Sequence, residues 1–200
     1  MLKISNLSYA RGNQLTLKNI NLSIDHSEIF LIKGPNGKGK STLLSCLAGF
    51  LDPLEGNIKY FSDIVDPVIA SKNFIFISEE NFAYEDLTIL QNINYWLSLN
   101  NITPNTEVIK NSISYLYDQL DITKKFYYLS FGQKRKMRIL LLLLINKPVW
   151  ILDDPFNGLD EESIKKITKI ISMKKDKQGM VIIATHIIPM ITGMKEYELR

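Results

Sequence analysis

The chain has 200 residues, 46% hydrophobic and 22% charged, which are the proportions of an ordinary globular protein rather than a disordered or fibrous one. The net charge of +3 gives little support to nucleic-acid binding, and a single cysteine, Cys46, excludes an internal disulfide. The longest apolar run, Ile139 to Ile145, is too short to span a membrane, and we expect no signal peptide at the start of the chain.

The first half of the chain predicts strands around one helix. Residues 2–9 and 15–24 alternate between apolar and polar side chains around a turn, which predicts an antiparallel pair. The apolar run 29–33 predicts a buried strand, and a glycine-rich loop and a helix ending near Gly49 follow it. Further short strands are expected near 58–61 and 74–77.

The second half alternates helices with two strands, and Thr88 is the expected N-cap of the first helix. The expected elements are helices at 87–97, at 106–120 and after Gly132, a strand at 149–152, a helix at 161–173 and a last core strand at 180–184. This pattern predicts an α/β fold with a mostly parallel core sheet and an N-terminal antiparallel part. We expect one domain over 1–200, with a helical subdomain inserted at about 86–146.

A full match to the phosphate-binding loop G-x-x-x-x-G-K-[ST] lies between the strand at 29–33 and the next helix. Glycines let the backbone approach phosphate oxygens, and the backbone N–H groups and the helix N-terminus favour an anion. Lys40 is expected to reach the β- and γ-phosphates and the Ser41 hydroxyl to bind Mg²⁺. The predicted nucleotide-binding residues of the loop are Gly34, Pro35, Asn36, Gly37, Lys38, Gly39, Lys40, Ser41 and Thr42. The sequence therefore predicts a site for a nucleoside triphosphate.

Two carboxylates end the apolar strand at 149–152. Asp153, at the tip of this strand, is expected to hold Mg²⁺ directly or through water, and Asp154 to polarise an attacking water. Upstream, Ser130 and Gly132 lie at the start of a helix, where the hydroxyl, the backbone N–H and the helix dipole can meet an anion. The basic run 134–136 is interpreted as a solvated helix face.

The order of phosphate loop, Leu-Ser-x-Gly-Gln, acidic strand and late histidine resembles the ATP-binding cassette (ABC) ATPases over essentially the whole chain. The resemblance implies an ABC-type P-loop fold that dimerises head to tail and holds ATP between the phosphate loop of one copy and the signature helix of the other. It implies that Tyr9 stacks on adenine and that His186 contacts the γ-phosphate. Residues 156–160 resemble the loop that couples the two sites. The implied signature residues, which clamp the γ-phosphate in trans, are Ser130, Gly132 and Gln133.

Three positions depart from the family pattern. Asp154 stands where the family has glutamate, and its side chain is shorter by roughly 1 Å, a misplacement that can cost on the order of a hundredfold in rate. Glu80 stands where the family has glutamine; its carboxylate can still bind Mg²⁺ but adds negative charge beside the phosphates. Lys38 stands where small residues are usual. We expect an ATPase whose hydrolysis is slowed or depends on partners. The alternative is an ATP-responsive clamp with little turnover.

The runs 87–96 and 129–136 resemble the ATP-binding subunit of the cytochrome c maturation heme-export system. This resemblance implies three partners: a second copy of the chain, an integral membrane permease and a heme chaperone complex. It implies a location on the cytoplasmic face of a bacterial inner membrane, or on the matrix side of a mitochondrial one. One alternative is an export ATPase for a drug, peptide or lipid. The other is a soluble cassette protein acting on DNA or ribosomes, but no nucleic-acid partner is expected because no strongly basic surface is visible.

Overall fold

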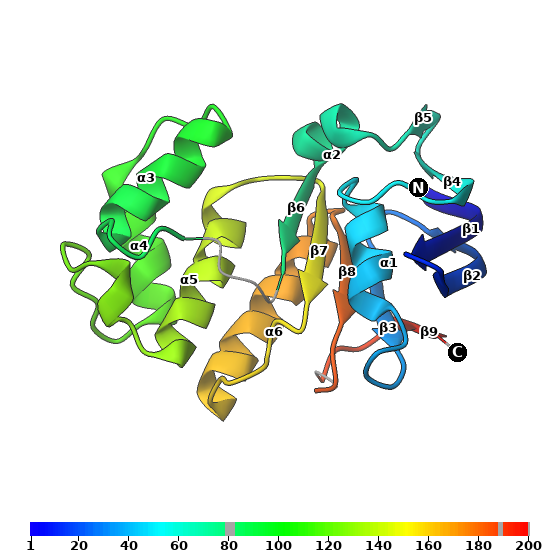
Figure 1. The fold of residues 1–200 in the computed structure, drawn as a ribbon. Helices are drawn as coiled ribbons and strands as arrows, with labels where there is room; N and C mark the ends of the chain where they lie inside the picture. The colour runs from blue at the N-terminus through cyan, green and yellow to red at the C-terminus, as the bar shows by residue number, and fades with distance from the viewer. Residues whose placement is uncertain (79–82, 188–189, 200) are drawn as a thin grey trace. The chain divides into compact units, whose positions relative to one another are not determined.

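The computed structural model describes residues 1–78, 83–187 and 190–199, and the chain forms two compact units (Figure 1). The first unit contains Met1–Ser78, Lys147–Pro155 and Ile171–Arg200. The second contains Glu79–Asn146 and Phe156–Ile170. Within the described residues, no helix combines the length and the apolar character that a membrane span requires.

An antiparallel sheet opens the first unit. In spatial order its strands are β2 (Gln14–Ile24), β1 (Leu2–Arg11), β4 (Glu55–Tyr60) and β5 (Asp63–Ile64). The alternation read from the sequence is present in β1, where Leu2 and Ile4 are buried and Lys3 is exposed. The predicted antiparallel pair at the start of the chain is confirmed, with Leu2 opposite Ile24.

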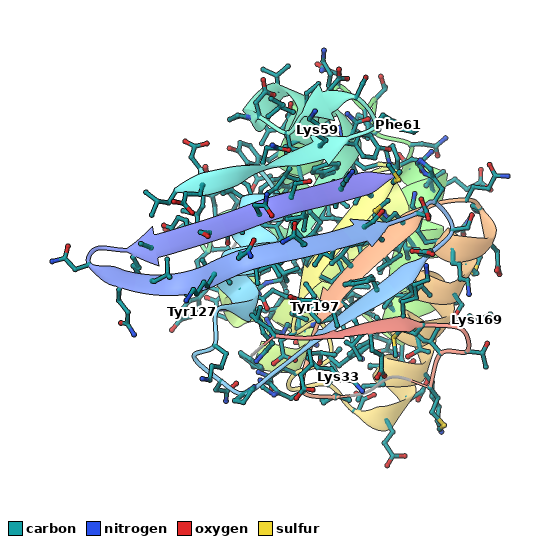
Figure 2. All side chains as sticks on the ribbon, turned by 90° about the vertical axis from the view of Figure 1, so that its right-hand side faces the viewer. Lys33, Lys59, Phe61, Tyr127, Lys169 and Tyr197 are labelled. Carbon is teal, nitrogen blue, oxygen red and sulfur yellow. The ribbon has the colours of Figure 1, made fainter. Side chains whose placement is uncertain are left out.

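A second sheet of the same unit is wholly parallel, in the order β6-β7-β8-β3-β9. Its strands are β3 (Ile29–Lys33), β6 (Phe74–Ile77), β7 (Val149–Asp153), β8 (Met180–Ala184) and β9 (Lys195–Glu198). Every residue of β7 and β8 is buried, as expected for parallel strands covered on both faces. Lys33 and Tyr197, labelled in Figure 2, come from the neighbouring strands β3 and β9. The predicted α/β fold with a mostly parallel core sheet is confirmed.

Helix α1 (Lys40–Leu47) packs against β7 and β8 of the parallel sheet and against β2 of the antiparallel sheet. Its buried side chains, Leu43, Leu44, Cys46 and Leu47, join one hydrophobic core with strands of both sheets. Burial raises the pKa of the Cys46 thiol to about 12, so Cys46 is a packed, unreactive side chain. A short helix, α2 (Pro67–Asn73), begins at the N-cap Asp66.

The second unit is mainly helical. Its elements are α3 (Ile89–Leu99), α4 (Thr106–Leu116), the 3₁₀ turn Phe126–Tyr128, α5 (Phe131–Leu144) and the first part of α6 (Glu161–Asp176), which continues into the first unit. Thr88 caps α3 as expected, and Gln91 completes a capping box with it. Asn92, fully buried, accepts the Tyr84 backbone N–H at 2.9 Å and donates to the Tyr84 and Thr88 carbonyls. These bonds attach the chain before α3 to that helix.

Several expectations from the sequence need correction. Met180–Ala184 is not the last strand of the core sheet, because β9 pairs with β3 beyond it. Helix α4 ends at Leu116 rather than near residue 120. The run 134–136 is not simply solvated. Arg135 is only 3% exposed, and its Nε donates to the Asn157 carbonyl at 3.3 Å.

Candidate functional site

Three strands of the parallel sheet bring the predicted nucleotide-binding segments to one edge. Ile32 of β3 pairs with Ala184 of β8, and Ala184 pairs in turn with Asp153 of β7. Neighbouring strands lie about 4.8 Å apart, so this row sets Asp153 roughly 10 Å from the strand that leads into the phosphate loop. Parallel strands end at the same edge, so the segments that follow them converge there. The phosphate loop follows β3, Asp154 follows β7 and His186 follows β8.

The phosphate loop leaves helix α1 without a side-chain cap. Its N-cap is Gly39, in the left-handed conformation with φ of 91°, and glycine has no side chain that could accept from the first-turn N–H groups. Gly37 is also left-handed, with φ of 77°. The first turn of α1 therefore presents backbone donors and the positive end of the helix dipole to an anion.

Lys40 is folded back over this loop. Its Nζ donates to the carbonyl oxygens of Gly34 at 2.7 Å and Pro35 at 3.0 Å, and its side chain is 9% exposed. An ammonium has three donors, so two bonds to the loop leave one for a phosphate oxygen. Pro35, Asn36, Gly37, Lys38 and Ser41 are exposed. The loop is thus open to solvent while its lysine is held in place.

Asp154 has an unusual backbone. Its φ is 46°, in the left-handed region that aspartate tolerates better than most residues, and its N–H donates to the Ala184 carbonyl at 2.7 Å. Its side-chain Oδ1 accepts the hydroxyl of Thr185 at 2.8 Å. His186, directly after Thr185, is exposed. The structure therefore brings Asp153, Asp154 and His186 to the edge of the sheet that also carries the phosphate loop.

Tyr9 lies in the antiparallel sheet, partly buried against the hydrophobic core. It pairs with Leu17 of β2. A Cβ placed on Gly39 would lie 3.0 Å from the Leu17 side chain, so β2 approaches the end of the phosphate loop. Tyr9 is therefore one strand away from the loop, although its stacking on adenine stays a prediction.

The donors at this edge suit a magnesium ion. Mg²⁺ prefers hard oxygen ligands and is held in nucleotide sites by one or two protein oxygens, with phosphates and water supplying the rest. Ser41 offers a hydroxyl and Asp153, only 9% exposed, a carboxylate. In the described part of the chain, no group of three or more His, Cys, Asp or Glu side chains could hold a metal ion. Glu80, the third predicted ligand, lies outside the described residues.

The start of helix α5 in the second unit is organised differently. Ser130 is its N-cap, and its Oγ accepts the Gln133 N–H at 3.3 Å, while the Gln133 side chain accepts the Ser130 N–H at 2.9 Å. The backbone N–H groups of Ser130 and Gln133 are therefore already used within the capping box. The Ser130 hydroxyl keeps its own hydrogen for a ligand.

The loop 156–160 is attached to α5. A Cβ on Gly132 would lie 3.3 Å from the Gly158 carbonyl, and Lys136 Nζ lies 3.7 Å from Asp160 Oδ2. Tyr117 also contacts α5 and donates its hydroxyl to the Gln133 carbonyl at 2.7 Å. Burial raises the pKa of Tyr117, so this phenol stays protonated and keeps donating.

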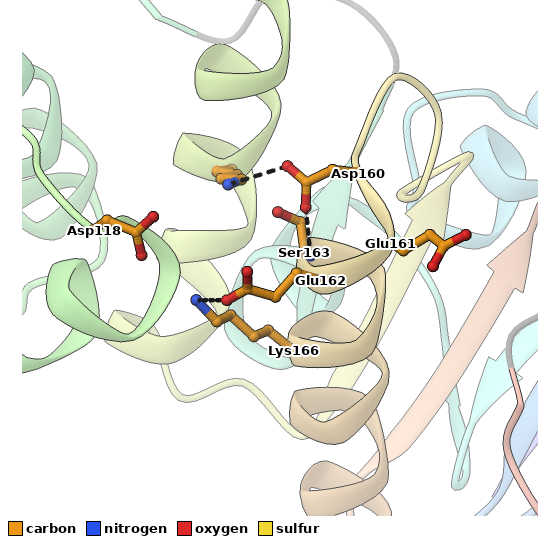
Figure 3. A pocket seen from close by; sticks show the side chains of 7 residues that line it. Asp118, Asp160, Glu161, Glu162, Ser163 and Lys166 are labelled. Carbon is orange, nitrogen blue, oxygen red and sulfur yellow. Dashed lines mark hydrogen bonds and ion pairs between the residues drawn. The ribbon is translucent and has the colours of Figure 1, made fainter.

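A cavity of about 310 Å³ lies beside this loop, at the start of α6 (Figure 3). It is lined by Asp118, Lys136, Asp160, Glu161, Glu162, Ser163 and Lys166. The Asp160 carboxylate accepts the Ser163 N–H at 2.7 Å, and Lys166 pairs with Glu162 at 2.8 Å. Four carboxylates against two lysine side chains leave the lining with a net negative charge, so this cavity disfavours an anion such as a nucleotide phosphate.

A comparison with known protein families decides the assignment. The family model for ABC transporters matches residues 17–157, more than half of the chain. The chain belongs to the ABC transporter family. It is 33% identical to the cytochrome c biogenesis ATP-binding export protein CcmA of Wolbachia pipientis wMel, over 93% of this chain and 89% of the relative. It is 34% identical to CcmA of Reclinomonas americana, over 92% and 84%.

Solved structures agree with membership of the ABC family. A putative ABC transporter ATP-binding protein from Pyrococcus furiosus has a TM-score of 0.84 and 28% identity, covering 99% of this chain and 96% of that one. A dimeric ATP-binding cassette described as a post-hydrolysis state bound to ADP and Pi has a TM-score of 0.81 and 25% identity, covering 94% and 88%. The resemblance read from the sequence motifs, down to the cytochrome c biogenesis relatives, is thus confirmed.

Within this ABC fold, sequence reasoning overlooked Thr185 and Tyr117. The sequence predicted a role for His186 but none for the threonine before it, although a Thr hydroxyl at the end of a buried strand was a signal of a polar contact. Tyr117 carries no signal of its own, because its contact with α5 arises only from the packing of α4 on α5.

Proposed function

We propose that this chain binds ATP with Mg²⁺ at the edge of the parallel sheet and hydrolyses it as the nucleotide-binding subunit of a membrane transporter. The observation that carries the proposal is the register Ile32–Ala184–Asp153, which gathers the phosphate loop, two carboxylates and His186 at one sheet edge. The uncapped first turn of α1 supports phosphate binding there.

Each residue has a role in this proposal. Mg²⁺, held by Ser41 and Asp153, would neutralise charge on the β- and γ-phosphates. Lys40 binds the phosphate oxygens and His186 contacts the γ-phosphate. Asp154 accepts a proton from the water whose oxygen bonds to the γ-phosphorus. The bond from that phosphorus to the bridging oxygen breaks, and ADP and phosphate leave.

The other half of the site would come from a second copy of the chain. Ser130, Gly132 and Gln133 of that copy would close over the γ-phosphate. The capping box supports this because it fixes the Ser130 hydroxyl at the helix start. The structurally similar cassette with ADP and Pi is a dimer, which is in keeping with the same arrangement here.

The transport role proposed is heme export or heme-chaperone release in cytochrome c biogenesis. The support is identity above 30% to CcmA proteins over most of both chains. The chain would then associate with a membrane permease and a heme chaperone complex, on the cytoplasmic face of a bacterial inner membrane or on the matrix side of a mitochondrial one. Recovery of a different permease, or of ribosomes or nucleic acid, on purification would contradict this role.

Phosphate release by the full chain, alone and in the membrane complex that co-purifies with it, tests the ATPase proposal. Asp154→Asn should lower kcat by about a hundredfold or more, the range for loss of a general base, with little change in ATP affinity. Asp154→Glu should raise kcat if the short side chain slows the wild type. Wild-type turnover unchanged by Asp154→Asn would show that Asp154 is not the base.

A further inference from the structure

We propose that Thr185 is a positioning residue for hydrolysis: its hydroxyl links the Asp154 carboxylate to the turn that carries His186. This inference rests on the proposed ATPase function, in which Asp154 is the base. It adds a residue to which neither the motifs nor the relatives give a role.

The Thr185 hydroxyl accepts one hydrogen bond and donates another. Its Oγ1 accepts the backbone N–H of Ile187 at 3.1 Å and donates to Asp154 Oδ1 at 2.8 Å. An ionised carboxylate is only an acceptor and a backbone N–H only a donor, so each bond can have one direction alone. Thr185 is 5% exposed, so water competes little for either bond.

Asp154 is held from two consecutive residues. Its backbone N–H donates to the carbonyl of Ala184, and its side chain accepts from Thr185. Its left-handed φ of 46° turns the backbone away from the direction of strand β7. The carboxylate still has acceptor sites for a water, since one bond uses only part of its capacity. The Thr185 hydroxyl thus restricts the rotation of the Asp154 carboxylate and leaves the carboxylate able to accept a proton from water.

The same hydroxyl restrains the neighbouring histidine. Thr185 and Ile187 flank His186, and their bond closes the turn on which the imidazole is carried. A displacement of His186 by a bound γ-phosphate would therefore move the hydroxyl that holds Asp154. Through Thr185, a movement of His186, which contacts the phosphate, would therefore change the position of Asp154, which accepts the proton.

The link depends on the length of the acidic side chain. With the backbone of residue 154 fixed by Ala184, a glutamate would carry its carboxylate one methylene farther from Cα than aspartate does. It could not accept from Thr185 in the same geometry. The contribution of Thr185 should therefore be specific to the aspartate of this chain.

A double-mutant cycle between positions 185 and 154 tests the proposal, using phosphate release by the full chain and its membrane complex. Thr185→Val should lower kcat by about tenfold to a hundredfold, the range expected for a loosened catalytic group, with KM changed by less than about twofold. Thr185→Ser, which keeps the hydroxyl, should restore turnover. In the Asp154→Glu background, Thr185→Val should change kcat by less than about twofold.

Matched controls separate this role from general stability. Thr123→Val removes a similar bond, from Thr123 to Asp121 at 2.6 Å, and should leave kcat unchanged. Thermal unfolding checks that each variant is folded, and Thr185→Ala replaces Thr185→Val if the valine does not fit.

Two results would overturn the link: a Thr185→Val kcat equal to the wild type, or an equal loss in the Asp154→Glu background. If Asp154→Asn is inactive while Thr185→Val is normal, only this inference fails. If Asp154→Asn keeps the wild-type rate, Asp154 is not the base, and the proposed mechanism on which this inference rests fails.

Discussion

The two helix starts that the sequence identifies as anion sites differ in how their backbone donors are used. Helix α1 begins at Gly39, which offers no capping side chain, so its first-turn N–H groups face the phosphate loop. Helix α5 begins at Ser130, where a capping box already satisfies the Gln133 N–H and the Ser130 N–H. The same local feature, a helix N-terminus after a polar loop, has no side-chain cap in one unit and a capping box in the other.

The two helix starts are therefore suited to different tasks: α1 to binding a phosphate, and α5 to completing a phosphate site that another surface has formed. An open helix start with a neighbouring lysine can bind a phosphate within one chain. The capped start of α5 has fewer such donors: the capping box uses the Ser130 and Gln133 N–H groups and leaves those of Phe131 and Gly132 with the Ser130 hydroxyl, which is a weaker site by itself. It is suited to add a contact to an anion that another surface already holds. This division is consistent with the proposed head-to-tail pair, in which α5 acts on the nucleotide of its partner.

The largest effect is expected from Gly39→Ala. An alanine at φ of 91° is strained, and its Cβ would lie 3.0 Å from Leu17 and Thr16 side chains, so the free energy of unfolding should fall by about 2 kcal/mol. ATP affinity, measured by titration calorimetry, should fall by at least about tenfold because the loop must shift.

The control for this change is Gly12→Ala in the β1–β2 turn. Gly12 also has positive φ, 60°, but a Cβ there meets nothing within 4 Å. It should cost about 1 kcal/mol and leave ATP affinity unchanged. Equal losses of affinity in both variants would mean that the open helix start is not the binding element.

A smaller effect is expected from Ser130→Ala, which removes the cap of α5. The free energy of unfolding should fall by about 1 kcal/mol, ATP affinity should stay the same, and turnover should fall. Thr88→Ala is its match, because Thr88 and Gln91 form the same capping box on α3. Urea unfolding should give similar losses for both, but phosphate release should fall only for Ser130→Ala. Equal turnover in the two variants would leave Ser130 with a capping role alone.

The smallest effect concerns pH and the loop attached to α5. The Asp160 pKa is lowered, first by the backbone N–H of Ser163 and next by the Ser163 side chain. A carboxyl with a lowered folded-state pKa stabilises the fold above its unfolded pKa, and this contribution is lost as pH falls through the folded pKa, below the ordinary 3.8.

Asp160→Asn should therefore lower stability near neutral pH by a small amount, and the difference from wild type should shrink in acid. Urea unfolding between about pH 7 and pH 3 measures it. Ser163→Ala keeps the backbone donor and should keep most of the pH dependence. A difference that is constant across this range would contradict the assignment.

The phosphate loop and its strand were predictable because their information is local. A complete motif, an apolar run and a following helix lie within about twenty residues, and β3 spans the predicted residues 29–33. The cap of α3 at Thr88 was predictable for the same reason, since a capping box is read from four consecutive positions.

Helix α2 and strand β9, which bury few side chains, were not predicted from the sequence. Helix α2 buries only Ala70, so it has no apolar period, and β9 is mostly exposed at the sheet edge, where its pairing with β3 decides its structure. The Thr185–Asp154 bond joins residues 31 positions apart and depends on the register of β7 and β8. Contacts set by register cannot be read from a single sequence, because alternation along each strand is the same in several registers.

The place of β3 in the sheet has a consequence for biosynthesis. Its two neighbours, β8 and β9, are made of residues 180–184 and 195–198, about 150 positions later in the chain. Contacts of such high sequence separation form late in folding. The glycine loop, although translated early, can gain its supporting strands only when residues 180–198 have left the ribosome. The apolar strand β3 therefore stays unpaired in the nascent chain until those residues emerge, and ATP can act as a folding ligand only after that point.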